Sequence, residues 1–279
     1  MKTIAALIKL MRPLNLLQGS IAVLVTGTLF AEFPSLATVL VGIAIVCCYN
    51  GAGNALNDYC DYEIDRINRP TRPLPAGLVA RWTALLWAIL LFVIGSGLGI
   101  IYGQGPLLLI MGIALLLLVA YSLYFKRLPL IGNFVVAVIL GMAFLFSATL
   151  FGEWRKGLPP ALLAFGFNLI REMVKDMQDI EGDLAAGART LPIRFGLKRA
   201  RNIVVGALAL LILGTFLPYW LGVYGRYYLY VVIGLVNLPL LYVMLAILRD
   251  YSSRHCGQLA RILKGDVFFG LLAIYLGKF

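Results

Sequence analysis

The chain has 279 residues, of which 61% are hydrophobic and only 13% are charged, and its mean hydropathy is +0.91. A soluble core of this size cannot bury so much apolar surface, so the composition excludes a soluble globular protein and indicates a polytopic membrane protein. The net charge of +11 would ordinarily suggest a nucleic-acid partner. The positions of the basic residues instead match the ends of membrane spans, and we expect no nucleic-acid binding.

Apolar runs of about 20 residues recur along the chain, and each is long enough to cross roughly 30 Å of hydrocarbon as a helix. They predict an all-α fold of nine transmembrane helices in one bundle, within a single domain covering residues 1–279. The predicted spans are 14–32, 36–58, 82–102, 105–123, 131–151, 159–178, 202–221, 226–248 and 260–277. In the third span, Gly95 and Gly99 are four residues apart, which predicts close packing of that helix.

The loop charges predict the orientation of these spans. With the N-terminus in the cytoplasm, all but four of the 24 lysines and arginines fall on the cytoplasmic side. The four exceptions are Arg155, Lys156, Arg226 and Lys278. We therefore expect a multi-pass protein of the cell (cytoplasmic) membrane with its C-terminus outside.

The second span ends in an acidic stretch, "GNALNDYCDYEIDRINRPTRPLPAG", at residues 53–77. On one helix Asn54, Asp58, Asp61 and Asp65 would share a face within about 60°. Carboxylates so close together near a membrane need a compensating cation, and oxygen-only ligands suit Mg²⁺. A solvated helix end, whose acids need no common face, is the alternative interpretation.

The spacing recurs at the end of the sixth span, in "REMVKDMQDIEGDLAAGARTLP" at residues 171–192. Glu172, Asp176, Asp179 and Asp183 have the same offsets as the first four residues. Both stretches, at about 53–77 and 171–196, end an apolar span on the cytoplasmic side and continue into a basic loop containing proline. This predicts an internal duplication whose two acidic stretches hold two magnesium ions with one diphosphate between them.

Basic residues accompany both stretches. Arg171 and Lys175 flank the second, and Arg66, Arg69 and Arg72 follow the first. Arginine and lysine commonly stabilise the charge that builds on a leaving diphosphate, although these residues could equally be ordinary anchors at span ends. The three prolines of "RINRPTRPLPAG" predict an ordered loop.

These residues resemble the UbiA superfamily of intramembrane prenyltransferases. The resemblance covers nearly the whole chain and rests on Asn57-Asp58-x-x-Asp61-x-x-x-Asp65 and Asp176-x-x-Asp179-x-x-x-Asp183. It implies a helical bundle around a central cavity and transfer of a prenyl group from a prenyl diphosphate. It also implies that the six aspartates are the catalytic metal ligands for Mg²⁺, expected as two ions.

The resemblance extends to substrate contacts. Asn54 and Asn57 would supply neutral oxygens or orient a ligand. The opening "RPLN" is similar to the N-terminal segment of the family, which implies that Arg12 and Asn15 lie near the diphosphate. The stretch "YSLYFKRLPLIGN" is similar to a further family segment, which implies roles for Tyr121 and Lys126.

Within the superfamily, the motifs are most similar to digeranylgeranylglyceryl phosphate synthases. This implies transfer of geranylgeranyl from geranylgeranyl diphosphate to the free hydroxyl of geranylgeranylglyceryl phosphate, a lipid acceptor, in ether-lipid synthesis. Lys126, Arg127 and Arg69 are then candidates for a separate pocket that binds the acceptor phosphate.

Other functions stay open. An aromatic or chlorophyll-type acceptor, such as 4-hydroxybenzoate, homogentisate or chlorophyllide, is one alternative. A transporter is another, but it predicts acids in the middle of spans, whereas these acids lie at span ends.

Overall fold

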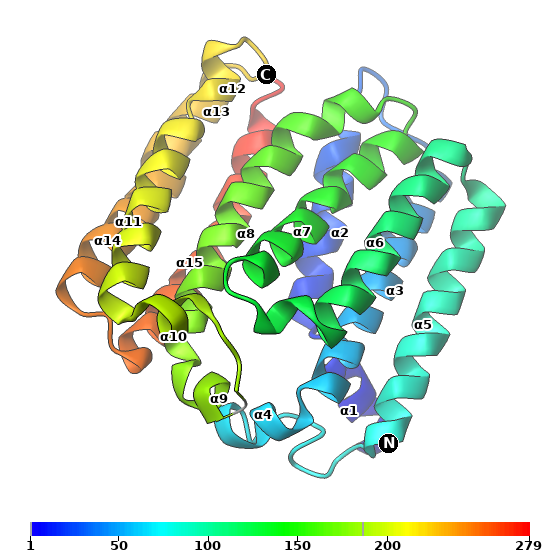
Figure 1. Cartoon of the computed structure of the whole chain (residues 1–279). Coiled ribbons are helices and arrows are strands. Elements are labelled where there is room, and N and C mark those ends of the chain that lie inside the picture. The colour runs from blue at the N-terminus through cyan, green and yellow to red at the C-terminus, as the bar shows by residue number, and fades with distance from the viewer. Residues whose placement is uncertain (1, 186) are drawn as a thin grey trace. The chain divides into compact units, whose positions relative to one another are not determined.

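The computed structural model describes residues 2–185 and 187–279, and the side chains of Lys2 and Arg127 lie outside that description. The described residues form helices, turns and loops and contain no strand (Figure 1), as the composition predicts. The chain divides into two compact units, one made of residues 1–126 with 142–157 and the other of residues 127–141 with 158–279. Each unit contains one of the two acidic stretches.

The first unit is built around the long helix α3, which packs against α2, α5 and α6. In α5, a Cβ atom added at Gly95 would lie 2.9 Å from Tyr49 of α3, and one added at Gly99 would touch Met111 of α6. The close packing predicted for these glycines is confirmed. The helices of this unit are α1 (Lys2–Leu10), α2 (Pro13–Gly27), α3 (Leu36–Cys60), α4 (Tyr62–Asn68), α5 (Arg81–Tyr102), α6 (Gly105–Leu123), the second half of α7 (Ile131–Leu150) and η2 (Trp154–Gly157).

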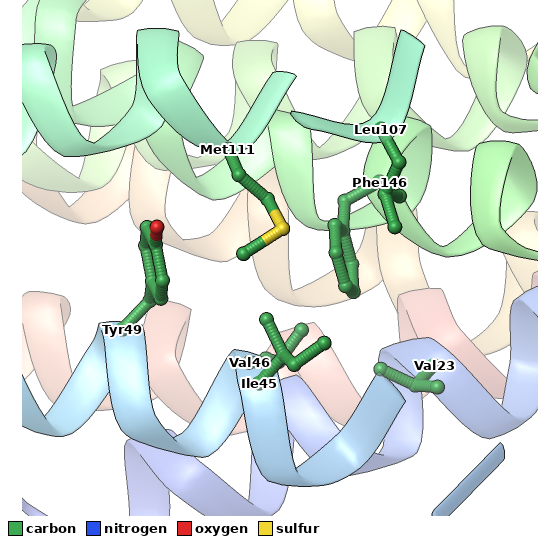
Figure 2. Close-up of a cluster of buried hydrophobic side chains, with 7 residues drawn as sticks. All are labelled: Val23, Ile45, Val46, Tyr49, Leu107, Met111 and Phe146. Carbon is green, nitrogen blue, oxygen red and sulfur yellow. The ribbon is translucent and has the colours of Figure 1, made fainter. Parts of the chain in front are cut away.

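A buried apolar cluster fixes α3 in place (Figure 2). The Tyr49 hydroxyl is hydrogen-bonded to the Ser96 hydroxyl of α5 at 2.9 Å, so its polar atom is paired where the ring is buried. The packing of this cluster therefore fixes the position of α3, whose end carries the first acidic stretch. The cluster comprises Val23, Ile45, Val46, Tyr49, Leu107, Met111 and Phe146.

In the second unit, α8 packs against α11 and α15, and α15 also packs along α13, η3 and α14. The Tyr228 hydroxyl donates to the Thr215 carbonyl at 2.7 Å, and the Gly225 N–H donates to the Gly277 carbonyl at 2.7 Å. A short 3₁₀ segment, η1 (Phe125–Arg127), precedes α7. The other elements are the first half of α7, α8 (Leu158–Gln178), α9 (Ile180–Ala185), α10 (Leu191–Phe195), α11 (Leu197–Gly214), α12 (Leu217–Trp220), α13 (Arg226–Val231), the π-helix η3 (Val232–Val236), α14 (Asn237–Arg249) and α15 (Ser253–Leu276).

Among the described residues, six helical segments are long and apolar enough to cross a membrane, or seven when the bent pair Thr3–Leu10 and Pro13–Gly27 counts as one span. The sixth and ninth predicted spans are helical, as α8 and α15, but they are not among these six segments. Helix α8 carries charged residues between Arg171 and Asp176, and α15 carries them between Arg254 and Asp266. The first predicted span is too long, because α2 ends at Gly27. The structure thus supports a multi-pass membrane protein, and the number nine stays a prediction.

Candidate functional site

The first acidic stretch bends in the middle. Helix α3 ends at Cys60 and α4 begins at Tyr62, with Asp61 between them at φ −88° and ψ 9°. The backbone still turns continuously, because the Asp61 N–H donates to the Asn57 carbonyl at 2.8 Å and the Asp65 N–H donates to the Asp61 carbonyl at 2.8 Å. The prediction that all four polar residues lie on one continuous helix is wrong, because the helix changes direction at Asp61.

The second acidic stretch bends at the corresponding residue. Helix α8 ends at Gln178, Asp179 lies between the helices, and α9 begins at Ile180. The Asp179 N–H donates to the Lys175 carbonyl at 2.9 Å, and the Asp183 N–H donates to the Asp179 carbonyl at 3.1 Å. The two stretches therefore share a local backbone path as well as a spacing, which supports the predicted duplication.

Two arginines bind the carboxylates of the first stretch. Arg72 Nη1 donates to Asp58 Oδ1 at 3.1 Å and to Asp65 Oδ2 at 2.6 Å, and Arg12 Nη2 donates to Asp58 Oδ1 at 2.5 Å. The Asp58 and Asp65 side chains are 3% and 6% exposed. A single guanidinium nitrogen therefore joins two buried carboxylates that come from different helices.

The turn between α1 and α2 positions Arg12. This residue has φ +56° and ψ 77°, a left-handed conformation that residues other than glycine seldom adopt. Asn54 of α3 donates from Nδ2 to the Met11 carbonyl at 3.0 Å and so ties the turn to the acidic helix. Asn54 thus supports the residue that contacts Asp58.

The proline-containing loop after α4 positions Arg72. The Ala76 N–H donates to the Arg72 carbonyl at 2.9 Å, and the Leu78 N–H donates to the Pro73 carbonyl at 2.9 Å. Leu74 is 2% exposed and packs in a cluster with residues of α1 and α5. The predicted ordered loop is confirmed, and its order comes from buried apolar residues, including Leu74 and Val79, and from local hydrogen bonds.

Asp61 has different partners. Asn57 Nδ2 donates to Asp61 Oδ2 at 2.8 Å, and Lys126 Nζ forms an ion pair with Asp61 Oδ1. The Lys126 side chain is 8% exposed, and its ammonium group pairs with the first acidic stretch. Its part in a separate acceptor pocket stays a prediction. Arg127, the neighbouring candidate for that pocket, has its side chain outside the described residues.

Burial and charge oppose each other at this site. Burial raises the pKa of Asp65, while the Arg72 charge and hydrogen bond act to lower it. The pKa of Arg72 is lowered by burial and by the nearby Arg12 charge, while Asp58 and Asp65 act to raise it. Each buried charge here depends on its partners, so removal of one partner leaves another uncompensated.

A neutral amide binds the second acidic stretch, and the sequence did not predict it. Asn133, at the start of α7, is 5% exposed and donates from Nδ2 to Asp176 Oδ2 at 2.9 Å. Arg171 and Lys175 instead bind Glu172, at 2.9 Å and 2.6 Å. The final residue of the quoted "YSLYFKRLPLIGN" stretch is this asparagine, but no local pattern shows that it reaches α8.

The remaining predicted contact residues lie on several different elements. Arg66 pairs with Glu63 at 3.2 Å, and the two side chains are 61% and 71% exposed. The others lie nearby in the chain: Asn15 in the first turn of α2, Arg69 directly after α4 and Tyr121 near the end of α6.

The carboxylate oxygens of the two acidic stretches are the type of ligand that Mg²⁺ prefers. Within the described part of the chain, no three His, Cys, Asp or Glu groups converge closely enough to hold a metal ion. Mg²⁺ seldom needs three, because it usually takes one or two protein carboxylates together with substrate phosphates and waters. Asp58 and Asp65 already meet at one cationic nitrogen, and Asp176 is held by an uncharged donor. The ligand set of six aspartates stays a prediction.

Known proteins resemble the chain over its full length. A protein of Thermococcus kodakarensis named digeranylgeranylglyceryl phosphate synthase is 39% identical over 276 residues, covering 98% of each chain. A solved structure described as giving insights into digeranylgeranylglyceryl phosphate synthase in membranes has a TM-score of 0.77 and 28% identity, covering 100% of this chain and 99% of the other. A UbiA homologue from Archaeoglobus fulgidus, solved with GPP and Mg²⁺, has a TM-score of 0.68 and 18% identity, covering 96% and 99%. Residues 20–265 match the family model described as the UbiA prenyltransferase family, and the chain therefore belongs to that family.

Proposed function

We propose that this prenyltransferase transfers a geranylgeranyl group from geranylgeranyl diphosphate to the free hydroxyl of geranylgeranylglyceryl phosphate. The observation that carries the proposal is the 39% identity to a digeranylgeranylglyceryl phosphate synthase over 98% of both chains. Similarity of that extent includes the segments that must bind the acceptor as well as those that bind the diphosphate. The further structural likeness to the same kind of synthase, with 28% identity, supports it.

The reaction exchanges one carbon–oxygen bond for another. The bond between C1 of the geranylgeranyl group and the diphosphate oxygen breaks, and the diphosphate leaves with the electron pair. The acceptor hydroxyl oxygen forms the new ether bond to C1 and releases its proton. Because an uncharged hydroxyl is a weak nucleophile, stabilisation of the leaving diphosphate contributes more than a strong base would.

The acidic stretches would hold Mg²⁺, and when bound this ion neutralises charge on the diphosphate. The A. fulgidus homologue solved with GPP and Mg²⁺ supports a divalent metal. The matching spacing and matching bend of the two stretches support the proposal that both act on one diphosphate, with two ions. The proposed ligands are Asp58, Asp61, Asp65, Asp176, Asp179 and Asp183.

The basic residues would bind the substrate directly. Arg12 and Arg72 already converge on Asp58, and each guanidinium has further donors for diphosphate oxygens. Asn57 and Asn133 would hold Asp61 and Asp176 in a fixed orientation toward the metal. The apolar helices would exclude water that would otherwise react with the allylic cation.

The proposed placement follows from the loop charges. We propose that the protein lies in the cell membrane with nine spans, and that its N-terminus and both acidic stretches face the cytoplasm. A soluble diphosphate head group would reach the site from that side while its tail lies among the helices.

An acceptor comparison tests the function. Purified protein in detergent receives Mg²⁺ and labelled geranylgeranyl diphosphate, with either geranylgeranylglyceryl phosphate or 4-hydroxybenzoate as acceptor. We expect a magnesium-dependent diether product with the first acceptor and none with the second. Product with 4-hydroxybenzoate alone would contradict the ether-lipid assignment while leaving the family unchanged.

A further inference from the structure

Helix α15 contains a buried carboxyl group that the proposed reaction does not use. Asp266 is 1% exposed, and neither of its side-chain oxygens has a hydrogen-bond partner among the described residues. Apart from Asp266 and Asn237, the buried residues of α15 and α14 are all apolar, and an ionised carboxylate without a cation is costly in such surroundings. The Asp266 carboxyl group must therefore be protonated, or bound to a group outside the described residues.

The helical period shows which neighbour Asp266 faces. Gly277 follows it by 11 residues, which is three turns, so both lie on one side of the helix axis. The Gly277 carbonyl accepts from the Gly225 N–H, and a Cβ atom added at Gly277 would lie 2.9 Å from Tyr224. Gly257, two and a half turns before Asp266, lies on the opposite side, against Gln178 at the end of α8. Asp266 therefore faces the segment formed by α13, η3 and α14.

Helix α15 and the segment formed by α13, η3 and α14 run antiparallel. The two ends of this pair show which residue lies level with Asp266. The pair is joined at one end by the short connection between Arg249 and Ser253, and at the other end Gly225 bonds to Gly277. Asn237 lies 12 residues from Gly225, and Asp266 lies 11 residues from Gly277. In two antiparallel helices these distances bring Asn237 and Asp266 to the same level.

The side-chain amide of Asn237 has an unpaired hydrogen-bond donor, which complements the unpaired oxygens of Asp266. It is 4% exposed, and its Oδ1 accepts from the Thr215 hydroxyl at 3.2 Å, while its Nδ2 has no partner within the described chain. It directly follows the π-helix η3 (Val232–Val236), a type of helical irregularity that is frequent at functional sites. A buried donor and a buried acceptor thus lie level with each other without bonding directly.

We propose that Asp266, carrying its proton, and Asn237 form a buried polar site that binds water between α14 and α15. A water molecule can accept from Asn237 Nδ2 and donate to an Asp266 oxygen, and buried waters commonly make about three such bonds. The Asp266 hydroxyl then donates to the same water or to a second one. This site is independent of the acidic stretches and of the reaction proposed above.

Infrared spectroscopy tests the protonated carboxyl directly. Wild-type protein, Asp266→Asn and Asp250→Asn are compared at neutral pH in detergent, and each is then transferred to D₂O. Asp250 is the matched control, since it is a solvent-exposed aspartate only 16 residues away. We expect a protonated-carboxyl band that shifts in D₂O, is lost in Asp266→Asn and persists in Asp250→Asn. A spectrum that Asp266→Asn leaves unchanged would overturn the proposal.

A double-mutant cycle tests the shared water. Asp266→Leu and Asn237→Leu each leave the other polar group without its bridge, whereas the double variant removes both groups. The fall in melting temperature of the double variant should therefore be smaller than the sum of the two single effects. Additive effects would show that the two residues share no ligand. If a leucine variant fails to fold, the infrared comparison still decides the proposal, because it uses the conservative asparagine.

Discussion

Individual side chains around the first acidic stretch compensate one another's charge. Asp58 accepts from two guanidinium groups, and Asp61 accepts from an amide and an ammonium group. Asp65 shares the Arg72 guanidinium with Asp58. Because each of these carboxylates is largely buried, loss of a partner should affect stability as well as activity.

Arg72 should be the most sensitive of the loop arginines. Arg72→Ala leaves Asp58 and Asp65 without their shared donor, and we expect a loss of about 1–3 kcal/mol in unfolding free energy together with a loss of prenyl transfer. Arg66→Ala is the control for stability, because its ion pair with Glu63 is exposed and contributes less than about 1 kcal/mol. Thermal unfolding in detergent measures both variants, and equal melting temperatures would contradict the bridging role of Arg72.

Asn133 should affect metal binding through Asp176. Asn133→Leu removes the donor that orients this carboxylate, and loss of such a supporting hydrogen bond typically weakens metal affinity about 10–100-fold. Titration of Mg²⁺ into the protein without substrate, followed by the rise in melting temperature, measures this directly. The exposed Asn202→Leu is the control. An unchanged Mg²⁺ dependence in Asn133→Leu would show that the hydrogen bond serves packing alone.

The sequence predicted some of these residues better than others. The aspartates were selected because their spacing repeats, and Arg72 because it lies close after the first stretch. Asn133 was missed because its contact with Asp176 depends on how α7 packs against α8, which no local pattern records. Arg66 was selected for its charge, yet its contact is a surface pair with Glu63.

At the scale of helices, apolar run length was a reliable guide where turns were clear. The predicted span 105–123 coincides with α6 (Gly105–Leu123), and 82–102 differs from α5 (Arg81–Tyr102) by one residue. The first span was less accurate, because the apolar run continues past the end of α2 at Gly27 into a turn. Hydropathy measures apolar content and does not show where the backbone leaves the helix.

The bends at Asp61 and Asp179 were not predicted either. A helical spacing of polar residues does not distinguish one helix from two consecutive helices joined by a single residue. Both stretches consist of a long helix, an interruption at the corresponding aspartate and a short helix, so a duplication would have included all three parts.

The buried Leu74 should contribute strongly to the order of the loop after α4. Leu74→Ala removes apolar volume from a packed cluster, and such changes typically cost about 2–5 kcal/mol. We also expect reduced turnover, because the loop carries Arg72. Leu78→Ala, in the same loop, is the control, since Leu78 is 51% exposed. Comparable melting temperatures for the two variants would contradict the anchoring role of Leu74.

The whole molecule consists of two units that each contain one acidic stretch and its basic partners. The family match at residues 20–265 includes parts of both units, and the single domain stays a prediction. That both stretches act in one reaction is our proposal, and the test that closes this section addresses it.

The proposed topology has a direct test. In a background without native cysteines, Glu153→Cys and Val223→Cys should react with an impermeant thiol reagent added outside cells, because both positions lie in predicted external loops. Leu184→Cys should react only after the membrane is permeabilised. External labelling at position 184 would contradict the placement of the second acidic stretch on the cytoplasmic side.

The most direct test of the account removes one aspartate from each stretch. Asp61→Ala and Asp179→Ala are purified together with the control Asp250→Ala. Asp250 is a solvent-exposed residue outside both stretches. Diether formation is measured with Mg²⁺, geranylgeranyl diphosphate and geranylgeranylglyceryl phosphate. We predict that each of the first two variants elutes as a folded protein and loses at least about 100-fold in turnover, while Asp250→Ala retains activity. Near wild-type turnover in either Asp61→Ala or Asp179→Ala would contradict the claim that the two acidic stretches act together on one diphosphate.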